Sequence, residues 1–422
     1  MNRNKIHPQL LEIMEQRIGV LEKKPISVIV ECRDPRALDG ISSLVDSVVR
    51  KHRLIDAFTA LVDESKIDEL SNYAWVTQIS FNYDRFHKTS GDIEPQLDES
   101  VPLLGAEKLW KEGYEGQGVS VGICDTEFDP KHPDLMFKEI VNLTNDSRHG
   151  TEEHGTHVSG IVAGSGKASG GKYRGLAPKV ELHGFQVLDS NGGGTMSDII
   201  EGVERAVDQG LDIINLSLGS DQPSNGEDPL SRACAEAAKR GVWVFVAAGN
   251  DGEGLIGIPA AAKGIAVCGA TDKQDNVASF SSRGNTLDGR YRPTFYFPGV
   301  NIKSARAFTT GYISFSGTSM ATPGGAGSAA AILSALKAKG IAKPSLARLI
   351  EAFQKTAKPL YIGGKKQPVG RAQVYEAYKD LLNAEPEPPP EPPPEPEPNN
   401  RLAVILTGLI LVGLIIFALL SR

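Results

Sequence analysis

Three short segments carry the residue types needed for nucleophilic catalysis by a serine. Asp125 ends the apolar stretch 119–125, His154 opens HGTHVSGIVAG, and Ser319 lies in the turn SFSGTSMATP. A serine hydroxyl is a poor nucleophile unless a base takes its proton, and that base needs a carboxylate to fix its tautomer. These three residues supply that set, and a helix that begins near Ser319 would direct a backbone N–H at developing negative charge.

The motifs around these residues resemble those of the subtilisin-like serine proteases. D-T-x-x-D-x-x-H-P-D-L, H-G-T-H-V-x-G and G-T-S-M-A follow one another, and the resemblance extends over roughly residues 101–380. It implies that Asp125 orients the general base His154, which activates the nucleophile Ser319. It also implies an oxyanion site made by the side-chain amide of Asn250 and the backbone N–H of Ser319.

The same resemblance implies a cleft in which a substrate peptide adds as a strand between two edges. The residues of the two edges are Leu216, Ser217, Leu218 and Gly219 on one side and Gly192, Gly193 and Gly194 on the other. The apolar wall of the pocket for the residue before the cleaved bond would be Ala247, Ala248 and Gly249. Protein or peptide substrates are therefore the expected partners.

Two positions depart from the family pattern. Glu127 stands where the family usually has glycine, and could alter the local turn or bring a carboxylate near the substrate edge. Gly324 and Gly325 replace the usual His-Val after the nucleophile, which removes a packing histidine and is expected to loosen the start of the helix. An alternative function is therefore a catalytically silent binding module with the same fold, held at a membrane.

The sequence indicates no required cofactor. His157 is expected to be a helix-packing residue. A zinc pair with His154 is not expected, because no Glu follows His154 as a H-E-x-x-H zinc site requires. Asp134 resembles a calcium ligand of some family members, but the loop 165–173 lacks the expected Asn ligands, so calcium is only a possible structural ion. Cys124, Cys234 and Cys268 are expected in the core.

Strands alternating with helices predict the peptidase domain over 101–383. The expected strands are 119–125, 180–188, 212–219, 242–249 and 264–270, and the expected helices are 197–209, 229–239 and 320–337. Nearly continuous apolar strands of this kind form a mostly parallel sheet covered on both faces. The prediction is a three-layer α/β fold of the subtilisin type, with its site at the carboxyl ends of the strands.

The N-terminal sequence predicts a helix within 1–25, followed by a small ferredoxin-like α+β domain over 26–84. Strands are expected at 26–31, 57–63 and 76–83, with helices at 38–52 and 65–73. This unit resembles the inhibitory prodomains of the family. The polar stretch 85–100 would be an exposed linker, and self-cleavage is expected within 84–102.

Two unusual segments follow the peptidase domain. The Glu/Pro-rich residues 384–400 predict an extended spacer, and the uncharged residues 402–420 predict a transmembrane helix with the bilayer as partner. The absence of an apolar leader favours a single-pass, C-terminal anchor with the protease in the cytosol, although a C-terminal sorting tail is an alternative. Five charges of the net −7 lie in the spacer, and a mildly acidic chain disfavours nucleic acid as a partner.

Overall fold

Seven parallel strands form the central sheet of the computed structural model, which describes residues 2–17, 24–33, 44–84, 86–88, 97–150 and 152–383. The strand order is β16-β13-β12-β10-β6-β8-β7. The strands are β6 (Ser120–Asp125), β7 (Phe137–Asn142), β8 (Glu181–Gln186), β10 (Ile213–Leu216), β12 (Trp243–Ala247), β13 (Ala266–Thr271) and β16 (Phe295–Pro298). The five predicted strands are all present, whereas the two edge strands were missed. No residue of β7 is fully buried, and β16 has only four residues.

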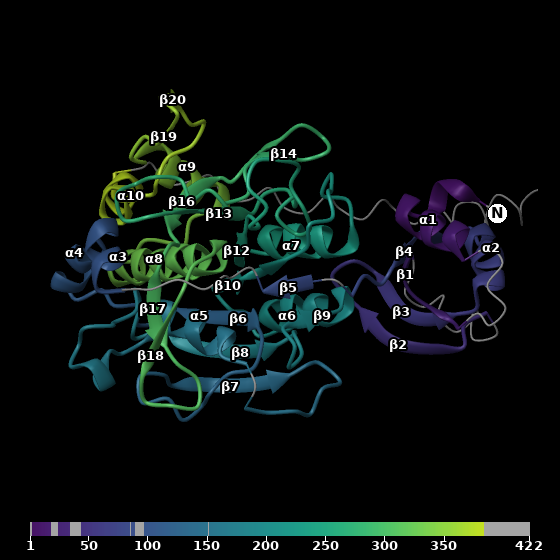
Figure 1. Ribbon diagram of the computed structural model, residues 1–422, viewed down its shortest axis with the longest axis horizontal. Helices are drawn as coiled ribbons and strands as arrows, with labels where there is room; N and C mark the ends of the chain where they lie inside the picture. Colours follow the sequence, from purple (N-terminus) through teal and green to yellow (C-terminus); the bar gives the residue numbers. More distant parts are fainter. Residues whose placement is uncertain are drawn as a thin grey trace, which may run out of the picture. The chain divides into compact units, whose positions relative to one another are not determined.

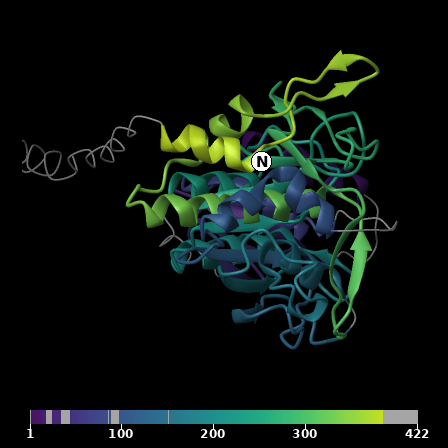
Figure 2. The ribbon, with the colours of Figure 1, turned by 90° about the vertical axis from the view of Figure 1, so that its left-hand side faces the viewer.

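Helices cover both faces of this sheet, as predicted (Figure 1). One face carries α5 (His154–Ala163) and α8 (Thr318–Ala338), and the other carries α6 (Met196–Asp208) and α7 (Pro229–Lys239). Both views show α10 (Val374–Leu382), in yellow, beside α8, in green (Figure 2). The remaining α-helices described in this part are α3 (Leu97–Leu104), α4 (Ala106–Lys111) and α9 (Leu346–Lys355).

Side chains that point alternately to the two faces of the sheet form two hydrophobic cores. Ile213 and Phe245 belong to the core under α5 and α8, whereas their neighbours Ile214 and Val244 belong to the core under α6 and α7. Because successive side chains of a strand point to opposite faces, apolar residues at consecutive positions fill both cores at once. The three-layer α/β prediction is therefore confirmed.

Short strand pairs surround the sheet. They are β14 (Gly284–Asn285) with β15 (Tyr291–Arg292), β17 (Ile302–Ala305) with β18 (Tyr312–Phe315), and β19 (Tyr361–Ile362) with β20 (Lys365–Lys366). A separate three-stranded sheet has the order β11 (Leu218–Gly219), β5 (Phe86–Lys88) and β9 (Gly193–Gly194).

An antiparallel sheet of order β2-β3-β1-β4 forms the N-terminal domain. Its elements are β1 (Ile26–Cys32), β2 (Ser47–His52), β3 (Ala57–Val62), β4 (Val76–Phe81), α1 (Pro8–Gln16) and α2 (Glu64–Asn72). The predicted helix over 38–52 is wrong over its described part, 44–52, which contains no helix and includes strand β2; residues 38–43 lie outside the described residues. Val48 and Val49 are 43% and 53% exposed. Their positions in the sequence fit the spacing of an amphipathic helix, but their side chains are not buried.

No helix among the described residues is long and apolar enough to cross a membrane. The predicted spacer 384–400 and the predicted transmembrane helix 402–420 lie outside the described residues.

Candidate active site

Asp125 and His154 meet where a strand ends and a helix begins. Asp125 is the last residue of β6 and His154 the first residue of α5, and both are buried. The Nδ1 atom of His154 lies 2.7 Å from Oδ1 of Asp125, which also accepts the Thr126 N–H at 2.7 Å. Since the carboxylate only accepts hydrogen bonds, Nδ1 carries the proton and Nε2 is left as the basic nitrogen.

Ser319 lies in the first turn of α8, next to the predicted substrate edge. Its hydroxyl donates to the main-chain carbonyl of Ser217 at 2.8 Å, and the Ser217 hydroxyl donates to the Ser319 carbonyl at 2.9 Å. Nε2 of His154 has no hydrogen-bond partner among the described residues. Proton transfer from Ser319 to His154 therefore requires the serine hydroxyl to turn away from Ser217.

Thr318 orients the side chain of Asn250. Oδ1 of Asn250 accepts both the backbone N–H and the hydroxyl of Thr318, each at 3.0 Å. This double contact identifies the oxygen end of the amide and turns its NH₂ group away from Thr318. Asn250 can thus serve as a side-chain hydrogen-bond donor beside the start of α8.

His157 has a packing role, as the sequence predicted. Its Nε2 lies 2.9 Å from the Ile302 carbonyl and 3.1 Å from the Ile313 carbonyl. Burial and the neighbouring His154 lower the pKa of His157 to about 3, so it stays neutral. The ring of Phe315 packs against both histidines, with centroid distances of 6.5 Å to His154 and 4.7 Å to His157.

An extended segment of the N-terminal region lies between the two predicted substrate edges. Strand β5 pairs with β11 through Leu218↔Lys88 and Gly219↔His87. It pairs with β9 through Phe86↔Gly194 and His87↔Gly193, and the Lys88 N–H donates to the Gly192 carbonyl at 3.4 Å. Both edges therefore receive a strand through main-chain bonds, the mode predicted for a substrate.

The predicted exposed linker over 85–100 is wrong at Phe86. This side chain is fully buried and meets the ring of Tyr83 edge-on at 5.7 Å. The alternation of buried Phe86, exposed His87 and half-buried Lys88 is that of a strand, but three residues are too few for the sequence pattern to reveal it.

A cavity of about 260 Å³ adjoins Lys88 in the cleft. Its lining includes the three residues predicted for the pocket wall together with the oxyanion candidate: Ala247, Ala248, Gly249 and Asn250. Leu216 and Ser217 lie at the other end of the same edge, where Ser217 holds the hydroxyl of Ser319.

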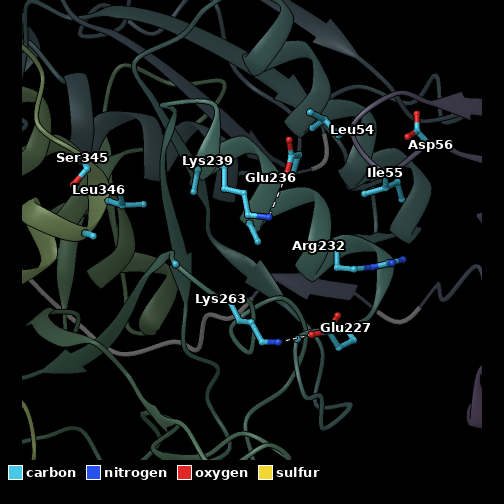
Figure 3. A pocket seen from close by; sticks show the side chains of 15 residues that line it. Leu54, Ile55, Asp56, Glu227, Arg232, Glu236, Lys239, Lys263, Ser345 and Leu346 are labelled. Atoms are coloured by element: carbon cyan, nitrogen blue, oxygen red, sulfur yellow. Dashed lines mark hydrogen bonds and ion pairs between the residues drawn. The ribbon is translucent and has the colours of Figure 1, made fainter. Parts of the chain in front are cut away.

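A larger cavity of about 710 Å³ contains none of these residues (Figure 3). Its lining includes residues of α7, of the turn 54–56 and of the start of α9, and several of its charged groups form ion pairs. Lys263 pairs with Glu227, and Lys239 lies 3.6 Å from Glu236. It carries no set of groups suited to catalysis.

Comparison with known proteins agrees with this geometry. Residues 116–367, more than half of the chain, match the family described as Subtilase family. The chain belongs to the subtilase family. It is 39% identical to the serine protease AprX of Bacillus subtilis over 57% of this chain and 63% of that protein. It is also 41% identical to subtilisin DY of Bacillus licheniformis, over 56% of this chain and 83% of the relative. Family membership and the catalytic set make this subtilase a serine endopeptidase.

Glu127 is the first departure of this subtilase from the family pattern. Its two carboxylate oxygens accept the N–H of Gly150 at 2.9 and 2.8 Å, and Oε1 lies 3.2 Å from Nδ1 of His149. Glu127 is 6% exposed. The carboxylate therefore anchors the loop that leads into His154.

The glycine pair after the nucleophile is the second departure. Helix α8 nevertheless begins at Thr318 and continues to Ala338, with Gly324 and Gly325 buried inside it. A Cβ at Gly325 would lie 3.0 Å from both Cys268 Sγ and a ring carbon of Phe245. Cys268 and Phe245 thus occupy the space of the missing valine, whereas a Cβ at Gly324 would lie no closer than 3.6 Å to its nearest neighbour, Phe297. The helix starts regularly at Thr318, in contrast to the expected loose start.

Asp134 does not fit a calcium site. Its Oδ2 accepts the Tyr312 hydroxyl at 2.6 Å, and its Oδ1 accepts the Ala168 N–H at 2.8 Å and the Ser165 hydroxyl at 3.4 Å. Hydrogen-bond donors approach both oxygens, where a cation would need the lone pairs. Burial and the bond to Asp134 raise the pKa of Tyr312 to about 12, which keeps it a donor.

Two acidic residues that contact the N-terminal region were not indicated by the sequence. Glu152 lies 2.6 Å from Nζ of Lys88, and Glu204 accepts the Leu54 N–H at 2.8 Å. Nothing in their local sequence distinguishes them from ordinary surface acids. The cysteines Cys124, Cys234 and Cys268 are buried as predicted, and burial raises the pKa of each thiol.

Proposed function

We propose that this subtilase is made as a self-inhibited zymogen, whose N-terminal domain acts as an inhibitory prodomain. The observation that carries the proposal is the position of β5, which pairs with β9 and β11 and so occupies the strand position of a substrate. A segment held there through main-chain bonds on both sides excludes other peptides from the cleft.

The catalytic roles follow from the contacts of the site. Ser319 attacks the scissile carbonyl when its hydroxyl leaves the Ser217 carbonyl and gives its proton to Nε2 of His154. Asp125 keeps that nitrogen basic through its 2.7 Å contact with Nδ1 and stabilises the imidazolium that forms. Asn250 and the backbone N–H of Ser319 donate to the oxyanion. His154 then protonates the leaving amine, and water hydrolyses the acyl-enzyme.

Further contacts support the inhibitory role of the N-terminal domain. Glu204 of α6 accepts the backbone N–H groups of both Arg53 and Leu54. Arg50 of β2 donates to Oδ1 of Asp198 at 2.7 Å, near the start of the same helix. These charge-assisted bonds hold the turn between β2 and β3 against α6.

The pairing register of β5 indicates the self-cleavage site. Lys88, the last residue of β5, opposes Leu218, the neighbour of Ser217 on the antiparallel substrate edge. Ser217 is the residue whose carbonyl holds the hydroxyl of Ser319. Thr89 lies outside the described residues, and we propose the Thr89–Ser90 bond as the processing site.

Mass spectrometry of purified full-length protein tests this proposal. The wild type should give an N-terminal fragment that ends at Thr89, and Ser319→Ala should remain intact. The same fragment boundary in Ser319→Ala would disprove self-processing. Labelling with a fluorophosphonate probe should also depend on Ser319, whereas a catalytically silent subtilase-fold module would not be labelled.

We further propose that residues 402–420 tether the enzyme to a membrane, with the protease domain in the cytosol. The proposal rests on nineteen uncharged residues, roughly 28 Å as a helix, after a Glu/Pro spacer that separates them from the domain. Carbonate extraction of cell membranes should leave the full chain in the pellet. Digestion of its protease domain by protease added to intact cells would contradict the cytosolic placement.

A further inference from the structure

The Lys88 side chain of β5 points into the cleft toward an acidic residue. Phe86 is fully buried, His87 is exposed and Lys88 is half-buried, so Phe86 and Lys88 face the enzyme while His87 faces away. Nζ of Lys88 lies 2.6 Å from Oε2 of Glu152. The ion pair therefore forms within the strand position that substrates would occupy.

Glu152 lies where it can contact a substrate side chain close to the cleaved bond. It precedes the general base His154 by two residues, and its side chain is only 12% exposed. A carboxylate this shielded from water gains more from a cation than a surface acid does. The adjacent Glu153 is occupied elsewhere, since its Oε1 lies 3.0 Å from Nε of Arg306.

Gly192 makes room for the stem of the lysine. A Cβ at this position would lie 3.2 to 3.5 Å from three side-chain carbons of Lys88, and the φ angle of Gly192 is +75°. The aliphatic part of Lys88 thus lies along bare backbone while its ammonium reaches Glu152. The subsite accommodates a long, unbranched stem with a terminal positive charge.

We propose that Glu152 is a specificity-determining residue, which makes this enzyme select lysine or arginine at the second position before the cleaved bond. The inference rests on the proposed function, because it treats β5 as an imitation of substrate. Lys88 is then the prodomain's own example of the preferred side chain, at the second position before the proposed scissile Thr89–Ser90 bond.

Competition between peptides in one reaction tests the proposal with the processed full-length enzyme. Peptides based on residues 84–92 carry lysine, arginine, glutamate or the uncharged lysine counterpart norleucine at position 88. They are mixed in pairs, and their consumption is followed by mass spectrometry. The ratio of the two rates equals the ratio of kcat/KM and does not depend on how much enzyme remains inhibited. Lysine and arginine should be favoured over norleucine about tenfold, and glutamate should be disfavoured further.

Substitutions at Glu152 and Glu153 distinguish a change in side-chain preference from a general loss of activity. Glu152→Gln should bring the lysine-to-norleucine ratio to within about twofold of one, and Glu152→Lys should favour the glutamate peptide over the lysine peptide. Glu153→Gln is the matched control and should preserve the wild-type ratio. A wild-type ratio near one, or a ratio that survives in Glu152→Gln, would overturn the proposal. Failure of every peptide to be cleaved in a Ser319-dependent manner would instead contradict the proposed function.

Discussion

The hydroxyl of Ser319 donates its hydrogen bond to the main-chain carbonyl of Ser217, 2.8 Å away, while Nε2 of His154 receives no bond from the described residues. That carbonyl belongs to the edge on which a substrate strand pairs. A peptide N–H that binds the Ser217 carbonyl competes with the serine hydroxyl for it. We therefore expect substrate binding to favour release of the nucleophile toward its base.

The Asp125–His154 contact leads to the first prediction. Asp125→Asn should lower kcat about 10⁴-fold with a much smaller change in KM, because an amide can donate to Nδ1 and hold the imidazole in the wrong tautomer. Steady-state hydrolysis of a peptide substrate measures the effect. A loss smaller than about tenfold would show that Asp125 does not set the tautomer of His154.

Asn250 should contribute mainly to the transition state. Asn250→Leu removes the side-chain donor at the oxyanion and should lower kcat roughly 10²–10³-fold while KM changes little. Thr318→Val keeps the backbone N–H that holds Oδ1 but loses the hydroxyl, so its effect should be smaller. Equal effects of the two substitutions on KM alone would argue against an oxyanion role.

Glu204 should strengthen inhibition by the N-terminal domain. Glu204→Gln replaces a carboxylate that accepts two backbone N–H groups with a neutral acceptor, and charge-assisted bonds are about twice as strong as neutral ones. Activity recovered after self-processing should therefore rise several-fold. Glu201→Gln is the control, because Glu201 pairs with Arg205 on the same helix at 3.0 Å. Equal activity in both variants would contradict the role of Glu204.

Because hydrogen-bond donors already occupy both oxygens of Asp134, we expect the folded protein to gain no stability from calcium at this position. Tyr312→Phe should lower the free energy of unfolding by about 1–3 kcal/mol, because it removes a donor from a buried carboxylate. A chelator should leave the Tm of the wild type unchanged. A marked fall in Tm with chelator that is absent in Asp134→Asn would identify a calcium ion there and refute this account.

Acidification should weaken the N-terminal domain through His52. Burial and the nearby Arg50 lower the pKa of His52 to about 4, and its Nε2 contacts the Thr59 hydroxyl at 2.8 Å. The unfolded chain binds the proton near pH 6.5, before the folded chain does, so stability is lost as the pH falls from about 6.5 to 4. Thermal unfolding of uncleaved Ser319→Ala should show this slope, and His52→Gln in that background should reduce it.

Long buried strands and catalytic motifs were readable from the sequence because each depends on residues close together in the chain. Strands β6, β8, β10, β12 and β13 are apolar runs that fill two cores, and helix α7 begins and ends at the predicted residues. The contacts of Glu127 and Gly325 could not be predicted from the sequence. Glu127 finds its partners in the loop before His154, and Gly325 is packed by Phe245 and Cys268 from the sheet.

The sequence alone determined the subtilase fold of this protein and the identity of its catalytic residues, because periodic apolar strands and contiguous motifs are local properties of the chain. Only the tertiary structure decided that residues 86–88 form a strand in the cleft. Their pairing partners lie more than a hundred residues away, and three residues have too little pattern to predict it. The meeting of Lys88 with Glu152 depends in turn on that register, since a shift of one residue would turn the lysine away from the enzyme.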